Sequence, residues 1–173
     1  RSDACADGIY VDGGKDIDVY DNYVENCDLG IEIATEHKGV VVDNIRVNNN
    51  TIVNSGLAGI SIGGYDAKKT GAAKNCVITN NTIYNTKGAC FLVQFACDSS
   101  NKFQKNLLIA ENKADAYEEA CKDKSRGNDV SDNLSNQEFK GAKEVKVEFG
   151  SADREEGKAT VVKTSMDGET IAG

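Results

Sequence analysis

The side chains best suited to chemistry in this chain lie at matching points of short segments that alternate polar and apolar residues. Three such segments share the pattern Gly-Ile-x-Ile/Val and occupy residues 8–11, 30–33 and 59–62. If their aliphatic residues point inward, as on one face of a strand, then Tyr10, Glu32 and Ser61 point outward side by side. An aromatic ring beside a carboxylate and a hydroxyl is suited to binding sugars.

Neighbouring positions extend this outer face. A second outward column is expected to contain Asp12, Ala34, Gly63 and Gln94. Beyond it come Glu36, Tyr65 and Asp66. Small residues flanked by acidic and aromatic ones predict a groove, and its predicted substrate-binding residues are Tyr10, Glu36, Tyr65, Asp66 and Gln94.

Asp12 and Glu32 form the first candidate catalytic pair. They are expected one coil and one pleat apart, which corresponds to about 8 Å between Cα atoms. Inverting glycosidases hold an acid and a base about 6.5–9.5 Å apart, so this pair could cleave a glycosidic bond. The alternative is that both are solvated carboxylates, which any acidic strand face carries.

The elements that position these residues are repeats. Residues 44–54 recur as residues 75–85, with more divergent copies at 16–26 and 106–115 and a truncated copy at 129–134. Within each copy, aliphatic and polar residues alternate with the two-residue period of a strand. A further alternating segment precedes each copy, and residues 89–93 supply the fourth. A repeat every 21 to 31 residues predicts a solenoid built from strands.

Asparagine recurs at one position of each repeat. The expected column is Asn22, Asn50, Asn81, Asn112 and Asn133, at spacings of 28, 31, 31 and 21 residues. An inward asparagine at a bend can hydrogen-bond the same asparagine one coil above and below. A second column at the next corner is predicted to contain Asn26, Asn54 and Asn85.

These patterns predict an all-β fold. Residues 1–136 are expected to form a right-handed parallel β-helix of about five coils. Residues 137–173 are expected to form a C-terminal β cap, with strands at 144–149 and 159–164, or the start of a linker.

The repeated Gly-Ile-x-Ile strands, each followed by Val/Ile-x-x-Asn-Asn-Thr-Ile-x-Asn, resemble the repeats of the pectate-lyase-like superfamily of parallel β-helix proteins. The resemblance implies a polysaccharide-active protein, with an acidic, uronate-containing chain bound along the outer face of the first sheet. It also implies a lysine or arginine base, for which the candidates are Lys68 and Lys69, with Lys38 as a third. Lyases of this kind use calcium, for which the candidate ligands are Asp12, Glu32, Glu36 and Asp66.

Two functions therefore stay open. One is a polysaccharide lyase, or a glycoside hydrolase. The other is a noncatalytic carbohydrate-binding or adhesion module that keeps the same groove, because this superfamily is similar to enzymes and binders alike.

Composition narrows the possible partners. The chain has 173 residues and a net charge of −8, so it lacks the basic surface of a nucleic-acid-binding protein. No apolar run reaches the roughly 18 residues of a membrane span, so no membrane is expected as a partner. The first strand starts within a few residues of Arg1, so we expect earlier coils or another protomer to cover that end of the stack.

Six cysteines indicate disulfides and hence export from the cell. Cys5 and Cys27 each precede a Gly-Ile segment by three residues, which predicts a disulfide between neighbouring coils. Cys90 is expected to pair with Cys121, for which Cys97 competes. Cys76 is instead predicted to be a buried thiol. The alternative for all of them is a set of small buried residues that stack without bonding.

Overall fold

The computed structural model describes residues 6–95, 97, 100–111, 114–120, 128–149, 162–166 and 169–170. Within those ranges the regular structure is entirely strand. In the described part of the chain there is thus no helix that is long and apolar enough to span a membrane.

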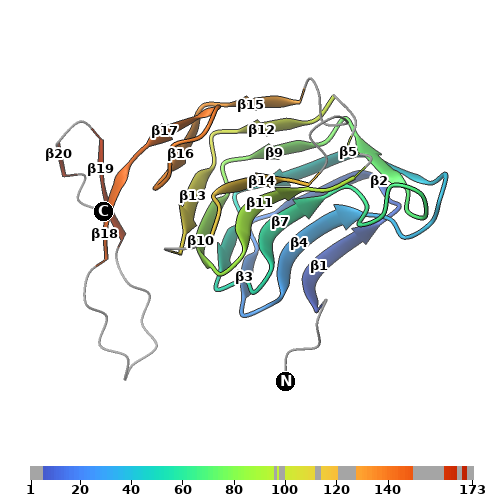
Figure 1. Cartoon of the computed structure of the whole chain (residues 1–173), viewed down its shortest axis with the longest axis horizontal. Coiled ribbons are helices and arrows are strands. Elements are labelled where there is room, and N and C mark those ends of the chain that lie inside the picture. Colours follow the sequence, from blue (N-terminus) through green and yellow to red (C-terminus); the bar gives the residue numbers. More distant parts are fainter. Residues whose placement is uncertain are drawn as a thin grey trace.

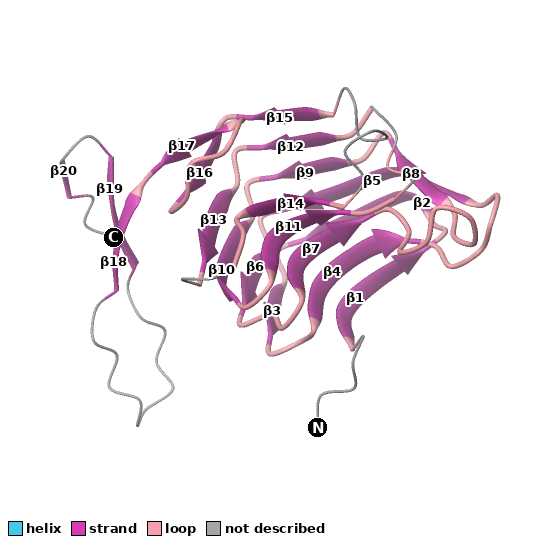
Figure 2. Ribbon diagram, viewed as in Figure 1, coloured by secondary structure: helices cyan, strands magenta, loops and turns pink. Residues whose placement is uncertain are grey.

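Three parallel sheets wrap around one core, and Figures 1 and 2 show their strands stacked coil upon coil. Sheet A contains β1 (Asp7–Asp12), β4 (Leu29–Ala34), β7 (Ala58–Ile62), β11 (Ala89–Val93) and β14 (Tyr117–Glu119). Sheet B contains β2 (Lys15–Tyr20), β5 (Val41–Asn48), β9 (Val77–Thr79), β12 (Lys102–Gln104) and β15 (Asp129–Ser131), and β8 (Ala72–Lys74) also pairs with β5. Sheet C contains β3 (Tyr23–Glu25), β6 (Thr51–Val53), β10 (Thr82–Thr86), β13 (Leu107–Ala110), β16 (Asn133–Ser135) and β17 (Ala142–Glu144).

The chain visits the sheets in the order A, B, C and then returns to A one coil further on. Sheet A therefore has five strands and four coil-to-coil steps. This arrangement confirms the predicted all-β solenoid.

Aliphatic side chains from all three sheets fill the interior. Ile31, Ile45 and Ile52 from successive strands of one coil are each fully buried, and the register partners of Ile31 and Ile52 in the next coil, Ile60 and Ile83, are almost or fully so. Each coil thus adds a layer of branched side chains that suits a pleated surface.

Glycine at the start of the sheet A strands allows close packing. A Cβ atom on Gly30 would clash with Ile52 and would lie 2.5 Å from the carbonyl oxygen of Gly59. The Gly-Ile pattern therefore reflects a corner where the backbone of one coil touches the core and the next coil.

An asparagine ladder lies at the corner between sheets B and C. The side-chain oxygens of Asn50, Asn81, Asn106 and Asn133 each accept hydrogen bonds from the backbone and the side chain of the asparagine one coil before, at 2.9–3.0 Å. The predicted fourth member was wrong, because Asn106 takes that place and Asn112 lies outside the described residues. The strand before Asn106 is β12, which has Phe103 as its one apolar residue, so the stronger apolar run 107–109 misled the alignment.

The second predicted column is confirmed at the corner between sheets C and A. Asn85 Nδ2 donates to Asn54 Oδ1 at 2.6 Å, and Asn54 Nδ2 donates to Asn26 Oδ1 at 3.2 Å. All three residues have φ between 58° and 59°, a left-handed conformation that asparagine tolerates better than most residues.

Cysteines behave as packing residues. Cys76 is fully buried, as predicted. The predicted disulfides of Cys27 and Cys90 were wrong, since both carry free thiols. A Cβ on Gly8 would lie 3.2 Å from Cys27 Sγ, so this thiol faces β1 at Gly8, while Cys90 Sγ lies 3.1 Å from Thr86 Oγ1. Their predicted partners, Cys5 and Cys121, lie outside the described residues.

Beyond the solenoid, β18 (Lys146–Phe149), β19 (Val162–Met166) and β20 (Glu169–Thr170) form an antiparallel sheet of their own. It appears in Figure 1 beyond β16 and β17, and its described strands share no ladder with sheets A to C. Pairing of β17 with β16 extends sheet C to Glu144, past the predicted boundary at residue 136. A capping role for the last segment stays a prediction.

Candidate functional site

The outer face of sheet A carries the predicted columns in the expected register. Tyr10 pairs with Glu32, Glu32 with Ser61, and Ser61 with Leu92 on successive strands. Tyr10 is 38% exposed and Glu32 is partly exposed, whereas Ser61 is fully buried between its neighbours in the ladder. The three polar side chains therefore lie on one face, while Ile31 and Ile60 beside them point into the core.

The second column also forms as predicted. Asp12 is exposed and pairs with Ala34, which is buried. Gly63 follows with φ at 93°, and a Cβ there would lie 2.6 Å from the carbonyl oxygen of Phe95. Gln94 continues the column, since its backbone nitrogen donates to the Ile62 oxygen at 2.8 Å.

A carboxyl pair joins β1 and β4, the first two strands of this sheet. Protonated Glu32 donates a hydrogen bond to Asp7, the first residue of β1. Burial, with the nearby carboxylate of Asp7, raises the pKa of Glu32 to about 8, and Glu36 and Asp12 add to the effect. Burial also raises the pKa of Asp7. Near neutral pH the pair therefore retains a proton that exposed carboxylates would have lost.

The tyrosine beside the pair feels the same environment. Burial and the carboxylates of Asp12 and Glu32 raise the pKa of Tyr10. The Tyr10 hydroxyl is thus neutral and able to donate a hydrogen bond across the physiological pH range.

Buried polar atoms without a hydrogen-bond partner concentrate on this sheet. Five such atoms occur in the described residues, and they are Asp7 Oδ1, Asp28 Oδ2, Ser55 Oγ, Ser61 Oγ and Gln94 Oε1. Asp7, Ser61 and Gln94 lie on or directly after sheet A strands, and Asp28 immediately precedes β4. Buried polar groups are normally satisfied, so such a group calls for a water, an ion or a ligand.

The rim loop after β7 holds the other predicted residues. Tyr65 is 61% exposed at its start. Asp66 Oδ1 accepts hydrogen bonds from the backbone nitrogens of Lys68 and Lys69, at 2.8 and 3.2 Å, and these bonds hold the pKa of Asp66 below its usual value. Lys69 Nζ lies 3.8 Å from Asp66 Oδ2. Asp66 thus organises its own loop, and in the described residues no hydrogen bond or ion pair joins that loop to Glu32.

A second loop lies against the first. The Gly71 nitrogen donates to the Thr35 oxygen at 3.0 Å, and a Cβ on Gly71 would lie 2.8 Å from the His37 oxygen. Exposed Glu36 and Lys38 therefore share this rim with Lys68 and Lys69.

The predicted calcium ligands do not form a ligand group. Among the described residues, no set of three His, Cys, Asp or Glu side chains is arranged to hold a metal ion. Glu32 is engaged with Asp7, and Asp66 with backbone amides of its loop. Calcium binding stays a prediction without a preformed site.

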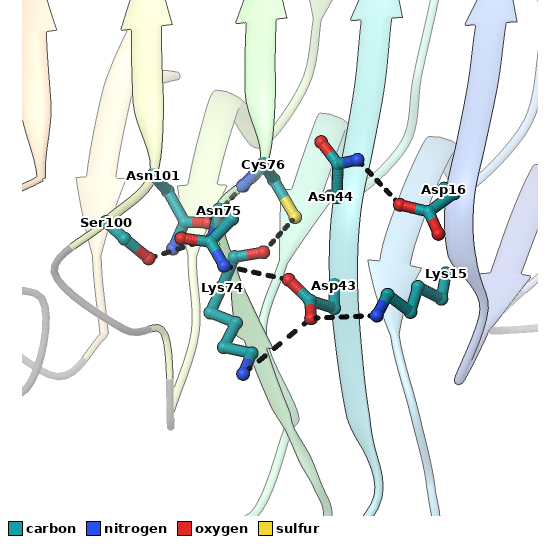
Figure 3. A network of polar contacts seen from close by, with 9 residues as sticks. All are labelled: Lys15, Asp16, Asp43, Asn44, Lys74, Asn75, Cys76, Ser100 and Asn101. Atoms are coloured by element: carbon teal, nitrogen blue, oxygen red, sulfur yellow. Dashed lines mark hydrogen bonds and ion pairs between the residues drawn. The ribbon is translucent and has the colours of Figure 1, made fainter.

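Charges near the start of sheet B are instead paired. Figure 3 shows Asp43 Oδ2 between Lys15 Nζ, at 4.0 Å, and Lys74 Nζ, at 3.7 Å. Asp43 Oδ1 accepts a hydrogen bond from Asn75 Nδ2 at 2.8 Å. Further along sheet B, Arg46 Nη2 donates to Asp18 Oδ2 at 2.8 Å. This surface therefore neutralises its own carboxylates, in contrast to sheet A.

Asp7 is the residue that analysis of the sequence missed. It pairs with Leu29, which pairs with Ala58, which pairs with Ala89, so over these four strands it is the one carboxylate in a column of buried apolar residues. A carboxylate in such a column can be recognised only when the pairing of the strands is known.

The comparisons with known proteins agree with the fold and leave the activity open. Over 110 residues, 61% of this chain, the sequence is 44% identical to an uncharacterized protein of Bacillus subtilis, YwoF. The matched region spans only 23% of that relative's length. No solved structure matches the chain. A family model described as "Right handed beta helix region" matches residues 2–135, and the chain therefore belongs to the right-handed β-helix family.

Proposed function

We propose that this protein binds an extended polysaccharide across the outer face of sheet A. The observation that carries the proposal is the concentration of unpartnered polar atoms, those of Asp7, Ser61 and Gln94, along the sheet that also carries the exposed ring of Tyr10. Sugar hydroxyls would supply the missing hydrogen bonds, and an exposed tyrosine can stack on a pyranose ring. Location outside the cell is part of the proposal, because long polysaccharides accumulate there.

The test compares two exposed tyrosines. Tyr10→Ala is expected to weaken oligosaccharide binding about tenfold by removing the stacking surface. Tyr20→Ala on sheet B is the control, since Tyr20 is 58% exposed but lies outside the proposed face. Calorimetric titration with a panel of neutral, acidic and amino oligosaccharides gives the comparison. Equal effects of the two substitutions, or no binding of any oligosaccharide, would exclude this face.

Hydrolysis is a second candidate, favoured by the raised pKa of Glu32. A carboxyl that keeps its proton near neutral pH is what a general acid requires, and exposed Asp12 could act as the base. Asp7 would be a positioning residue that holds the proton on Glu32. Release of reducing ends, lost in Glu32→Gln, tests this activity.

A lyase acting on uronates would use Lys68 or Lys69 as its base, in line with the resemblance of the repeats to pectate-lyase-like proteins. Both lysines are exposed at the rim, which supports a role as the base. Absorbance of unsaturated products from polygalacturonate or alginate separates the lyase from the hydrolase, and the absence of both products would leave a binding module.

A further inference from the structure

The unpartnered atoms on sheet A have a common chemistry. Asp7 Oδ1, Asp28 Oδ2 and Gln94 Oε1 are oxygens that accept hydrogen bonds. Asp7 and Asp28 lie at the starts of β1 and β4, whereas Gln94 follows the end of β11, so a chain that spans the face would have to bring donors to both ends of these strands. Ser61 Oγ adds an independent indication, because this side chain is fully buried, has no partner, and lies next to Glu32 in the ladder of the same face.

The charges of the face have one sign. Asp7, Asp12 and Glu36 all act on Glu32 to favour its protonated form, and among the described residues no lysine or arginine acts on it. Asp28 adds a further negative charge beside Asp7. Such a surface repels a polyuronate and attracts a cation.

A metal ion is a poor match for this cluster. Calcium needs about six to eight oxygen ligands, and the described residues contain no group of even three acidic, histidine or cysteine side chains arranged for a metal. An ammonium group needs only two or three acceptors, because it has three donor hydrogens. Asp7 and Glu32 together provide them.

We propose that this face recognises an amino-sugar polysaccharide, with a protonated amino group seated between Asp7 and Glu32. This inference rests on the polysaccharide-binding function proposed above and names its substrate class. Exposed Tyr10, which follows Asp7 along β1 and pairs with Glu32, would stack on the sugar ring that carries the amino group.

Proton release is a consequence of this geometry. The free pair holds a proton between Asp7 and Glu32, and an ammonium group beside both carboxylates favours their ionised forms. Binding should therefore expel a proton into the buffer. The charged and titratable groups that face the pair are Asp12, Asp28, Glu36 and Tyr10.

The experiment compares ligands of equal length on the wild-type protein. Oligomers of glucosamine, N-acetylglucosamine and galacturonate are titrated by calorimetry at about pH 6, where amines of this kind are protonated. The glucosamine oligomer is expected to bind at least about tenfold tighter than the other two, because charge-assisted hydrogen bonds are the stronger ones. Repeating the titration in buffers of different ionisation enthalpy is expected to show the released proton.

Two variants test whether Asp7 and Glu32 cause the preference for the glucosamine oligomer. Asp7→Asn combined with Glu32→Gln should remove the preference for the glucosamine oligomer. Glu32→Gln alone should abolish proton release, because the amide has no proton to give up. Glu25→Gln on sheet C makes the same side-chain substitution as Glu32→Gln at an exposed site and should preserve both preference and proton release.

Each outcome of the ligand comparison has a distinct meaning, and this comparison needs no variant to fold. Equal or tighter binding of the acetylated or acidic oligomer would overturn the amino-sugar inference and leave the polysaccharide function standing. Equal binding of polylysine would overturn it as well, by showing general polycation attraction. Binding of none of the three oligomers would overturn the amino-sugar inference, and absence of binding across the whole oligosaccharide panel would overturn the polysaccharide function as well.

Discussion

The corner between sheets B and C and the outer face of sheet A handle buried polar atoms in opposite ways. At the corner, Asn81 is almost fully buried, yet its Oδ1 accepts from Asn50 and its Nδ2 donates to three oxygens. On sheet A, Asp7 and Ser61 each leave a buried oxygen without a partner. The same coil geometry produces both regions, so this solenoid is able to satisfy its polar groups and does not do so on sheet A.

The difference distinguishes buried polar groups that stabilise the fold from those that we assign to ligand binding. Repeated amides form a ladder because each coil offers the next coil the same donor and acceptor. Sheet A places unlike residues in register, from Tyr10 to Glu32 to Ser61, so the stacking itself cannot satisfy them. The fold could have stacked identical residues on this face, as it does at the corner. We therefore take the different polar residues in register on sheet A as evidence for a ligand.

The largest expected effect comes from breaking the satisfied region. Asn81→Asp would place a carboxylate against the oxygens of Val47, Thr79 and Asn106, to which the amide now donates. A buried charge without a partner should lower the free energy of unfolding by about 3–5 kcal/mol. Chemical denaturation of both proteins measures the loss.

Exposed Asn26, in the second asparagine column, supplies the matched control. Asn26 Oδ1 only accepts a hydrogen bond from Asn54, so Asn26→Asp keeps the acceptor and stays exposed. The expected change is within about 0.5 kcal/mol. Equal losses in the two variants would mean that burial of the ladder does not matter to its stability.

The repeats made the fold predictable, and irregular coils limited the prediction. Similar motifs at 44–54 and 75–85 established the repeat, and the Gly-Ile-x-Ile/Val segments placed Tyr10 beside Glu32. Asn106 was missed because β12 has only three residues and little apolar character. Repeats therefore predict residue positions less well in coils whose strands are short.

The candidate site was only partly predictable for a different reason. Its columns follow from strand alternation, which is local. The pairing of Asp7 with Glu32 depends on burial and on which carboxylate takes the proton, and neither is encoded in a residue pattern. The predicted disulfides rested on alignment along the stack, which places two cysteines on neighbouring coils but does not establish a bond, and Cys27 and Cys90 are free thiols.

A smaller effect is expected from titrating the unsatisfied region. The pKa of Glu32 is about 8 in the folded protein, against an ordinary value of 4.5. Between these values the unfolded chain loses its proton while the folded protein keeps it, so ionisation favours unfolding and stability falls as pH rises from about 4.5 to 8. Below that window both states hold the proton, and above it neither does.

Glu32→Gln removes this titration. Relative to the wild type, the variant should gain about 1–2 kcal/mol of unfolding free energy between pH 5 and pH 8, a figure reduced for the partial exposure of the carboxyl. Thermal unfolding at several pH values provides the measurement, and Glu25→Gln serves again as the control. A constant difference between wild type and Glu32→Gln across this range would show that the pair does not hold its proton.

The smallest effect, and the most direct comparison of the two kinds of region, comes from two fully buried serines. Ser135 Oγ accepts a hydrogen bond from the Gln137 nitrogen at 3.0 Å, whereas Ser61 Oγ has no partner. Ser135→Ala should cost about 1 kcal/mol, because it leaves that amide unpaired. Ser61→Ala should be neutral or stabilising by up to about 0.5 kcal/mol, since it removes an unsatisfied hydroxyl, and it should weaken oligosaccharide binding.

Denaturation and calorimetry of the Ser135→Ala and Ser61→Ala variants test these two expectations. A Ser61→Ala variant that is as destabilised as Ser135→Ala, with unchanged binding, would assign the Ser61 hydroxyl to the structure of the sheet instead of to a ligand.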